Sequence, residues 1–133
     1  MNYLLDTDTC SYVMRQSNAA LLERFSDVAD GDAALSVITQ GELQTGIAKV
    51  PQAKQLRLRL ERLNSVLPTL ELPAAAAQTY ARIRQHLERK GQIIGANDLW
   101  IAAHALAAGL ILVTNNTREF SRVPGLKLEN WLA

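Results

Sequence analysis

Cysteine, aromatic residues and long apolar runs are all scarce in this chain of 133 residues. The single cysteine, Cys10, excludes an internal disulfide and a zinc site built from several thiolates, and we interpret it as a small buried residue. No segment approaches the roughly 18 apolar residues that span a bilayer, and no basic leader precedes an apolar run at the start. The sequence therefore predicts a cytoplasmic protein with no membrane partner.

Charge is nearly balanced but unevenly placed. The formal net charge of +1 indicates no particular partner, yet segments 54–62 and 82–90 each contain four Lys or Arg residues against one Glu. Such runs are usually solvated helix faces, although they would become phosphate contacts if they flanked an acidic pocket. With 48% hydrophobic residues the chain can bury a real core, and we expect residues 1–133 to form one domain.

The apolar residues recur in a pattern that predicts strands alternating with helices. The predicted strands are 3–5, 33–37, 66–72, 110–113 and 126–128. The predicted helices begin after Asp6 and cover 18–25, 39–50, 52–63, 73–90, 97–108 and 117–121. This alternation predicts an α/β fold with a mostly parallel sheet covered on both faces, whose ligands bind beyond the carboxyl ends of the strands.

Several polar residues, together with a proline and a glycine, suggest where these elements begin and end. Residues 7–9, Thr-Asp-Thr, are good N-cap candidates for the first helix. Thr39 and Glu42 have the spacing of a capping box, which would begin the third helix. Pro68 favours a sheet edge for strand 66–72, and Gly109 is well placed to end helix 97–108.

Four acidic residues lie at or just beyond the ends of apolar segments: Asp6, Glu42, Asp98 and Glu119. A folded α/β domain can bring such distant carboxylates together at strand ends and helix starts. Gathered in one pocket, they would repel each other unless a hard cation lay among them. The sequence therefore predicts a Mg²⁺ or Mn²⁺ site and, with it, phosphodiester hydrolysis.

Each acid also has a structural interpretation. Asp6 could cap a helix, but the polar residues after it offer caps already, so we interpret its charge beside a buried strand as functional. A capping box would explain Glu42, and the start of a helix would explain Asp98; their joint occurrence favours a site. Glu119 could be an ordinary first-turn acid. Asn116 is neutral and could orient a water or a ligand without adding charge.

Histidine and tryptophan, which are common in functional sites, have structural interpretations here. His104 lies six residues beyond Asp98, off the same helix face, and is predicted to be a packed polar residue. His86 lies in a basic amphipathic run and is predicted to be at the surface. Trp100 and Trp131 are predicted to anchor packing.

Taken together, four segments resemble the VapC toxins of the PIN-domain family, and the similarity covers essentially the whole chain. These segments are LLDTD at 4–8, TQGELQTG at 39–46, IGANDLWIAAHALAAG at 94–109 and LVTNNTREFSRVPGLKLENW at 112–131. The resemblance implies that Asp6, Glu42 and Asp98 correspond to the metal-binding and catalytic acids of the family's first three motifs.

The fourth motif departs from the commonest family pattern. Many PIN domains carry an aspartate where this chain has Asn116, within the run that begins at Thr114. Glu119, three residues further on, resembles the acid that a subset of VapC toxins uses instead. The resemblance therefore leaves two candidates for the fourth position.

The family resemblance also implies an architecture, an activity and partners. It implies a three-layer α/β/α sandwich and a Mg²⁺-dependent endoribonuclease that cuts tRNA, with the anticodon region of initiator tRNA the best candidate. It further implies a type II toxin–antitoxin system in which a VapB antitoxin inhibits the toxin, with toxin homodimers inside a larger complex.

As a working hypothesis, Asp6 and Asp98 ligate the metal directly, and Glu42 and Glu119 act through water or a second ion. Thr114 and Asn116 would position a water or a phosphate oxygen. The six catalytic candidates are Asp6, Glu42, Asp98, Thr114, Asn116 and Glu119.

Two other functions are consistent with parts of the sequence. Asp6-Thr7-Asp8 after a strand resembles the nucleophile motif of haloacid-dehalogenase-like phosphatases, although Cys10 departs from that motif and no lysine motif follows. Neutral Asn116 would also be consistent with a catalytically silent PIN domain that only binds or regulates.

Overall fold

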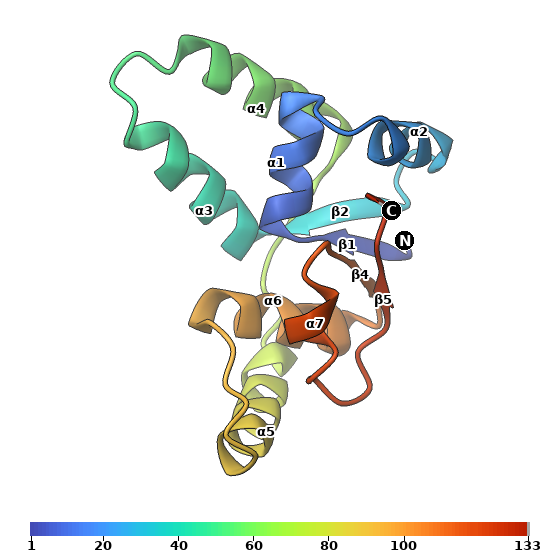
Figure 1. Cartoon of the computed structure of the whole chain (residues 1–133), viewed down its shortest axis with the longest axis vertical. Coiled ribbons are helices and arrows are strands. Elements are labelled where there is room, and N and C mark those ends of the chain that lie inside the picture. The colour runs from blue at the N-terminus through green and yellow to red at the C-terminus, as the bar shows by residue number, and fades with distance from the viewer. Residues whose placement is uncertain (133) are drawn as a thin grey trace.

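A computed structural model describes residues 1–132 and shows a parallel sheet between two layers of helices (Figure 1). The strands are β1 (Tyr3–Leu5), β2 (Ala33–Ser36), β3 (Thr69–Leu70), β4 (Ile111–Val113) and β5 (Leu128–Glu129). Their order in the sheet is β3-β2-β1-β4-β5, and every neighbouring pair is parallel. The α/β prediction is thereby confirmed.

The helices divide between the two faces of the sheet (Figure 1). The first layer contains α1 (Thr7–Arg15), α2 (Ala19–Asp27), α3 (Val37–Ala48) and α4 (Lys54–Val66). The second contains α5 (Ala75–Arg89), α6 (Ala96–Ala108) and the short α7 (Thr117–Phe120). None of the helices within residues 1–132 is long and apolar enough to cross a membrane.

The sheet separates two apolar cores because successive side chains of a strand point to opposite faces. Leu4 of β1 and Leu112 of β4 pack against α5 and α6, whereas their neighbours Leu5 and Val113 pack against the α1–α4 layer. These four side chains have no exposed surface. A run of consecutive apolar residues is therefore what a strand covered on both sides requires, and this is why the short strands were predictable.

Two helix starts differ from the sequence prediction. The N-cap of α1 is Asp6 itself, whose side chain accepts from the Thr9 amide, so the expected caps at residues 7–9 are wrong. The third helix begins at Val37, two residues before Thr39, and Ser36 is its cap. Asp6 and Ser36 both keep an extended backbone at the point where a strand gives way to a helix. The side chain of each accepts a hydrogen bond from a backbone amide in the first turn of that helix, which is the geometry of an N-cap.

Strand lengths are the other difference. Strand β3 covers only Thr69–Leu70 of the predicted 66–72, although it does lie at the sheet edge, as Pro68 indicated. The last strand begins at Leu128, the final residue of the predicted 126–128. Both are edge strands with a single neighbour, and each pairs with it through two residues.

The carboxyl ends of the three central strands meet at one edge of the sheet. Strand β1 runs into Asp6, β2 runs into α3, and β4 runs into Thr114. The amide of Asp6 donates to the Val113 carbonyl oxygen at 3.0 Å, which fixes the ends of β1 and β4 side by side. Ligands of open parallel sheets bind at this edge, so it is where the predicted acids should be sought.

Candidate functional site

Asp6 is a buried carboxylate held at both oxygens. It is 3% exposed. Its Oδ1 accepts from the Thr9 amide at 2.9 Å, and its Oδ2 accepts from the Thr114 hydroxyl at 2.6 Å. Burial raises the pKa of Asp6 above its ordinary value, while these hydrogen bonds act in the opposite direction. Asp6 is therefore both the helix cap and an aligned anion, so the structural and functional interpretations do not exclude each other.

Glu42 lies on α3 and is held by Thr7, which the sequence suggested only as a candidate helix cap. The Thr7 hydroxyl donates to Oε1 of Glu42 at 2.6 Å. A capping box would have turned Glu42 back toward the start of its own helix, but α3 begins earlier and Ser36 caps it. The capping-box interpretation of Glu42 is thus wrong. The side chain instead reaches across to α1, beside Asp6.

Asp98 lies in the first turn of α6 and faces the other acids. Its pKa is raised to about 6, first by burial and then by the negative charges of Glu42, Asp6, Glu119 and Asp8, in that order. No hydrogen bond offsets these effects within residues 1–132. Because charge repulsion falls with distance, this pattern indicates that the acids of α1, α3 and α7 lie near enough to Asp98 to act on its charge.

The segment after β4 contributes the fourth acid. Thr114 is fully buried, and its hydroxyl oxygen accepts from the Asn116 amide at 2.9 Å. The Asn116 side-chain amide in turn donates to Oε2 of Glu119 at 2.8 Å. Asn116 therefore orients Glu119, and the two candidates for the fourth position form one unit.

The acids approach one another without forming a closed cage. Within residues 1–132, no three His, Cys, Asp or Glu side chains lie close enough to hold a metal ion as they stand. The donors available are carboxylate and hydroxyl oxygens, the ligand type that Mg²⁺ prefers over the nitrogen and sulfur ligands of zinc sites. The donor types therefore suit a hard divalent cation.

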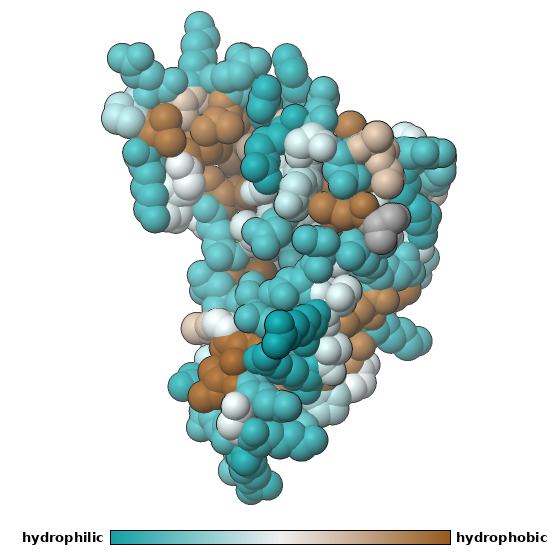
Figure 2. All heavy atoms as spheres, viewed as in Figure 1, coloured by the Kyte–Doolittle hydropathy of each residue, from teal (hydrophilic) through white to brown (hydrophobic). Residues whose placement is uncertain are grey.

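The acidic site opens to the surface beside α3. A hollow of ≈ 350 Å³ adjoins it, and Thr7, Asp8, Glu42 and Leu56 are among its lining residues. The molecular surface narrows between the part formed by α3 and α4 and the part formed by α5 and α6, and hydrophilic side chains dominate there (Figure 2).

The structural interpretations of His104, Trp100, Trp131 and Cys10 are confirmed, whereas His86, predicted at the surface, is only partly exposed. His104 is 1% exposed, its Nδ1 lies 2.8 Å from the Ser36 hydroxyl, and burial lowers its pKa. Trp100 stacks on Tyr80 with ring centroids 3.8 Å apart. Trp131 is 4% exposed, and Cys10 is fully buried, with its thiol pKa raised mainly by burial.

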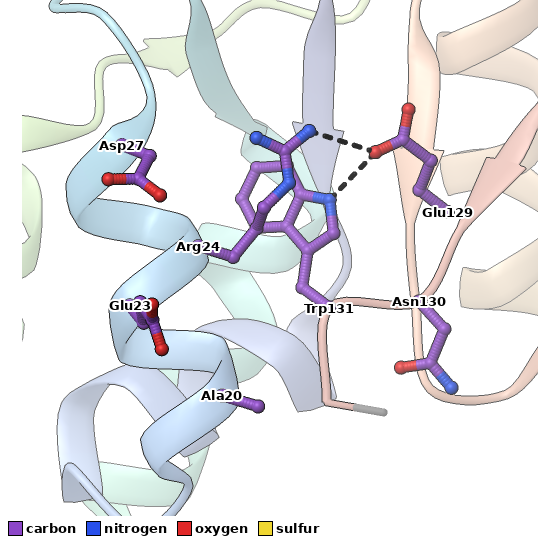
Figure 3. A pocket seen from close by; sticks show the side chains of 7 residues that line it. All are labelled: Ala20, Glu23, Arg24, Asp27, Glu129, Asn130 and Trp131. Carbon is purple, nitrogen blue, oxygen red and sulfur yellow. Dashed lines mark hydrogen bonds and ion pairs between the residues drawn. The ribbon is translucent and has the colours of Figure 1, made fainter.

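A second hollow, of ≈ 400 Å³, lies away from the acids, between α2 and the last strand (Figure 3). There Oε1 of Glu129 accepts from Trp131 Nε1 at 2.9 Å and pairs with Arg24 at 3.3 Å. The Arg24 guanidinium also lies over the Trp131 ring, 5.0 Å from its centroid. These contacts fasten the end of the described chain to α2, and none of the predicted catalytic residues lines this hollow.

Fold and site together define an α/β protein with an acidic pocket at the carboxyl edge of its parallel sheet. The PIN domain family profile matches residues 3–126. "Ribonuclease VapC2" of Rickettsia felis is 39% identical over 132 residues, 98% of each chain. The "tRNA(fMet)-specific endonuclease VapC" of Shigella flexneri is 38% identical over 131 residues, also 98% of each chain.

Solved structures agree with these sequence relatives. The VapBC2 complex of Rickettsia felis bound to a promoter DNA fragment contains a chain that matches with a TM-score of 0.92 and 39% identity, over 98% of this chain and 99% of that one. DNA-bound VapBC of Salmonella typhimurium matches with a TM-score of 0.91 and 36% identity, over 98% of each chain. The chain belongs to the PIN-domain family and, within it, to the VapC proteins. This confirms the resemblance and the fold that the sequence segments indicated.

Proposed function

We propose that this chain is the toxin of a type II toxin–antitoxin pair and acts as a metal-dependent endoribonuclease. The observation that supports the proposal is the set of carboxylates at the carboxyl edge of the sheet, where burial and then the charges of Glu42, Asp6 and Glu119 raise the pKa of Asp98. Concentrated negative charge repels RNA, so such a site becomes useful to a nuclease only with a divalent cation bound. Relatives named as ribonucleases over nearly the whole chain support the same reading.

Asp6 and Asp98 would hold Mg²⁺ directly, and Mn²⁺ offers the same oxygen chemistry. Mg²⁺ keeps several waters, so two direct carboxylate ligands are sufficient. When bound, the ion supplies charge neutralisation at the scissile phosphate and a more acidic water. Glu42 and Glu119 would act through water or a second ion, consistent with their greater exposure relative to Asp6.

The other residues of the site orient these acids. The Thr114 hydroxyl keeps Asp6 turned into the pocket, and the Asn116 amide does the same for Glu119. Water that attacks phosphorus and displaces the 3′ oxygen leaves a 5′-phosphate and a 3′-hydroxyl. The ribose 2′-hydroxyl takes no part in this route, so no cyclic phosphate forms.

The substrate we propose is tRNA, with initiator tRNA the first choice. The name of the Shigella flexneri relative supports this choice. RNA is recognised largely through shape and single-stranded loops. We propose that the 133 residues act as a single domain in the cytoplasm.

The partner we propose is a VapB-type antitoxin, with toxin homodimers in the larger complex. Support comes from relatives solved as VapBC complexes. A further support is an apolar groove of ≈ 480 Å³ between α3 and α4, where Ile47, Val50 and Leu60 lie among polar residues. Brown apolar side chains gather between these helices in Figure 2. Exposed apolar surface of this kind is typical of a protein-binding site.

Cleavage of purified tRNAs by the full chain tests the function. We expect cuts that require Mg²⁺ or Mn²⁺, stop on addition of EDTA, are absent with Asp6→Asn, and carry 5′-phosphate ends. No chelator-sensitive cleavage of any RNA would favour a silent binding domain. A 2′,3′-cyclic phosphate would exclude direct attack by water, and a phosphorylated Asp6 would favour the phosphatase.

A further inference from the structure

Thr7 connects two of the acid-bearing elements. It is the first residue of α1, directly after Asp6, and its hydroxyl donates to Glu42 of α3 at 2.6 Å. The Thr7 and Thr39 hydroxyl oxygens are also 3.2 Å apart. Thr39 is fully buried and lies one turn before Glu42 on the same helix face. The three side chains therefore form a short chain of hydrogen bonds at the edge of the acidic pocket.

The number of hydroxyl protons determines which group donates in each of these hydrogen bonds. A hydroxyl has one proton and can accept at its oxygen. The 2.6 Å contact has the length expected for a hydroxyl that donates to a carboxylate, so Thr7 uses its proton there. Thr39 then supplies the proton for the contact between the two hydroxyls. Thr7 is thus fixed as the donor to Glu42 by a buried partner.

Glu42 needs such a donor more than the shorter acid Asp6 does. A glutamate has three side-chain torsions and loses considerable rotamer entropy when it is held in one position. Three of the four acids have a donor: Asp6 has Thr114, Glu119 has Asn116, and Glu42 has Thr7. Without its donor, Glu42 could turn from the pocket into the adjoining hollow, which it also lines.

We propose that Thr7 is a positioning residue that holds the Glu42 carboxylate toward Asp98 and thereby sets the affinity of the site for its divalent ion. This inference rests on the proposed function. Residues that hydrogen-bond to a metal-binding side chain and so fix its orientation typically contribute on the order of tenfold or more to metal affinity or activity. Thr7 does not touch the substrate and acts only through Glu42.

The test compares Thr7→Val, which keeps the shape but loses the hydroxyl, with Thr7→Ser, which keeps the hydroxyl. Thr45→Val is the matched control, since Thr45 is an exposed threonine on the same helix as Glu42 whose hydroxyl bonds only the Gly41 carbonyl. Mn²⁺ binding to each full-length, RNA-free protein is measured by calorimetry. The Mg²⁺ concentration for half-maximal cleavage, kcat and KM for tRNA are measured beside it.

We expect Thr7→Val to weaken Mn²⁺ binding and raise the half-saturating Mg²⁺ concentration about tenfold, with KM for tRNA unchanged. Thr7→Ser and Thr45→Val should both behave as the parent. In the Glu42→Gln background, Thr7→Val should add nothing. Should Thr7→Val fail to fold, Thr7→Ala takes its place, because this half-exposed position tolerates a smaller side chain.

Two failures can be told apart. If the parent protein neither binds Mn²⁺ nor cleaves RNA, the proposed function is wrong. If the parent does both and Thr7→Val matches it, the positioning role is wrong while the function stands. A loss that Thr7→Ser does not rescue, or one that persists in the Glu42→Gln background, would likewise overturn the role.

Discussion

Asp98→Asn should stabilise the metal-free protein at neutral pH. In the folded chain the Asp98 carboxyl is half-buried and surrounded by the charges of Glu42, Asp6 and Glu119, which raise its pKa to about 6 from an ordinary 3.8. The unfolded chain relieves both effects. At pH 7 the ionised Asp98 carboxylate therefore lowers the free energy of unfolding. An asparagine of the same shape removes that cost.

The size and pH dependence follow from the pKa of Asp98. A rise of about two units corresponds to about 3 kcal/mol, which solvent screening of this half-exposed group reduces to about 1.5 kcal/mol. Loss of a favourable charge in the first turn of α6 opposes this by about 0.5 kcal/mol. The net gain is about 1 kcal/mol, or a melting temperature higher by about 4 °C.

Because the folded pKa lies above the unfolded one, the folded chain binds more protons between about pH 4 and pH 6. The stability of the parent therefore falls as the pH rises through that window, and the advantage of Asp98→Asn grows over the same window. Below about pH 4 both states of the parent are protonated and the two proteins should converge.

Thermal melts in EDTA between pH 4 and pH 7.5, followed by circular dichroism, measure this difference. Asp8→Asn is the matched control, since it also removes a first-turn helix charge but from an exposed position. Asp8 is the last of the four charges that act on Asp98, so its removal should bring a much smaller gain. Equal melting temperatures of Asp98→Asn and the parent at pH 7 would refute the reasoning. So would a gain that stayed constant down to pH 4, because that gain could not come from the carboxyl charge.

Three further predictions concern other parts of the site. Asp6→Asn should reduce cleavage below detection, yet this variant should melt within about 4 °C of the parent because asparagine caps a helix as well as aspartate does. A much lower metal-free melting temperature would assign Asp6 a structural role alone. Ser36→Ala removes the cap of α3 and the hydrogen-bond partner of buried His104, so the free energy of unfolding measured in urea should fall by about 2 kcal/mol. An unchanged urea midpoint would contradict the role of this pair. Glu119→Gln should slow single-turnover cleavage more than Asn116→Ala, because the amide acts by orienting Glu119, and the reverse order would give the fourth position to Asn116.

The fold was predictable because its signals are local. Runs such as Leu110 to Val113 are apolar without interruption, which is what a strand buried on both faces requires, and Gly109 ends α6 with a positive φ of 69°. Edge strands were harder. The sequence of 66–72 allows a longer strand, but β3 pairs only through Thr69 and Leu70, and this limit is set by its neighbour β2.

The sequence singled out candidate site residues but not the contacts among them. Asp6, Glu42, Asp98 and Glu119 stand out by charge at element ends, and the charges of the other three contribute to the raised pKa of Asp98. The Thr7 contact with Glu42 joins residues 35 apart in sequence. Nothing in the local pattern distinguishes a threonine that caps a helix from one that holds a distant glutamate, so this contact required the tertiary structure.

Asp6 illustrates why structural and functional roles should not be weighed as alternatives at strand ends. The extended backbone that ends β1 is also the backbone of an N-cap, and the capping bond aligns the carboxylate that the pocket needs. Burial destabilises its charge while the donors from Thr9 and Thr114 stabilise it, and burial prevails. A bound divalent ion would reverse that balance for Asp6 and Asp98 together. An ion that binds only the folded chain stabilises it by RT ln(1 + [L]/Kd), so the cost of holding these anions together without metal becomes a stabilisation in its presence.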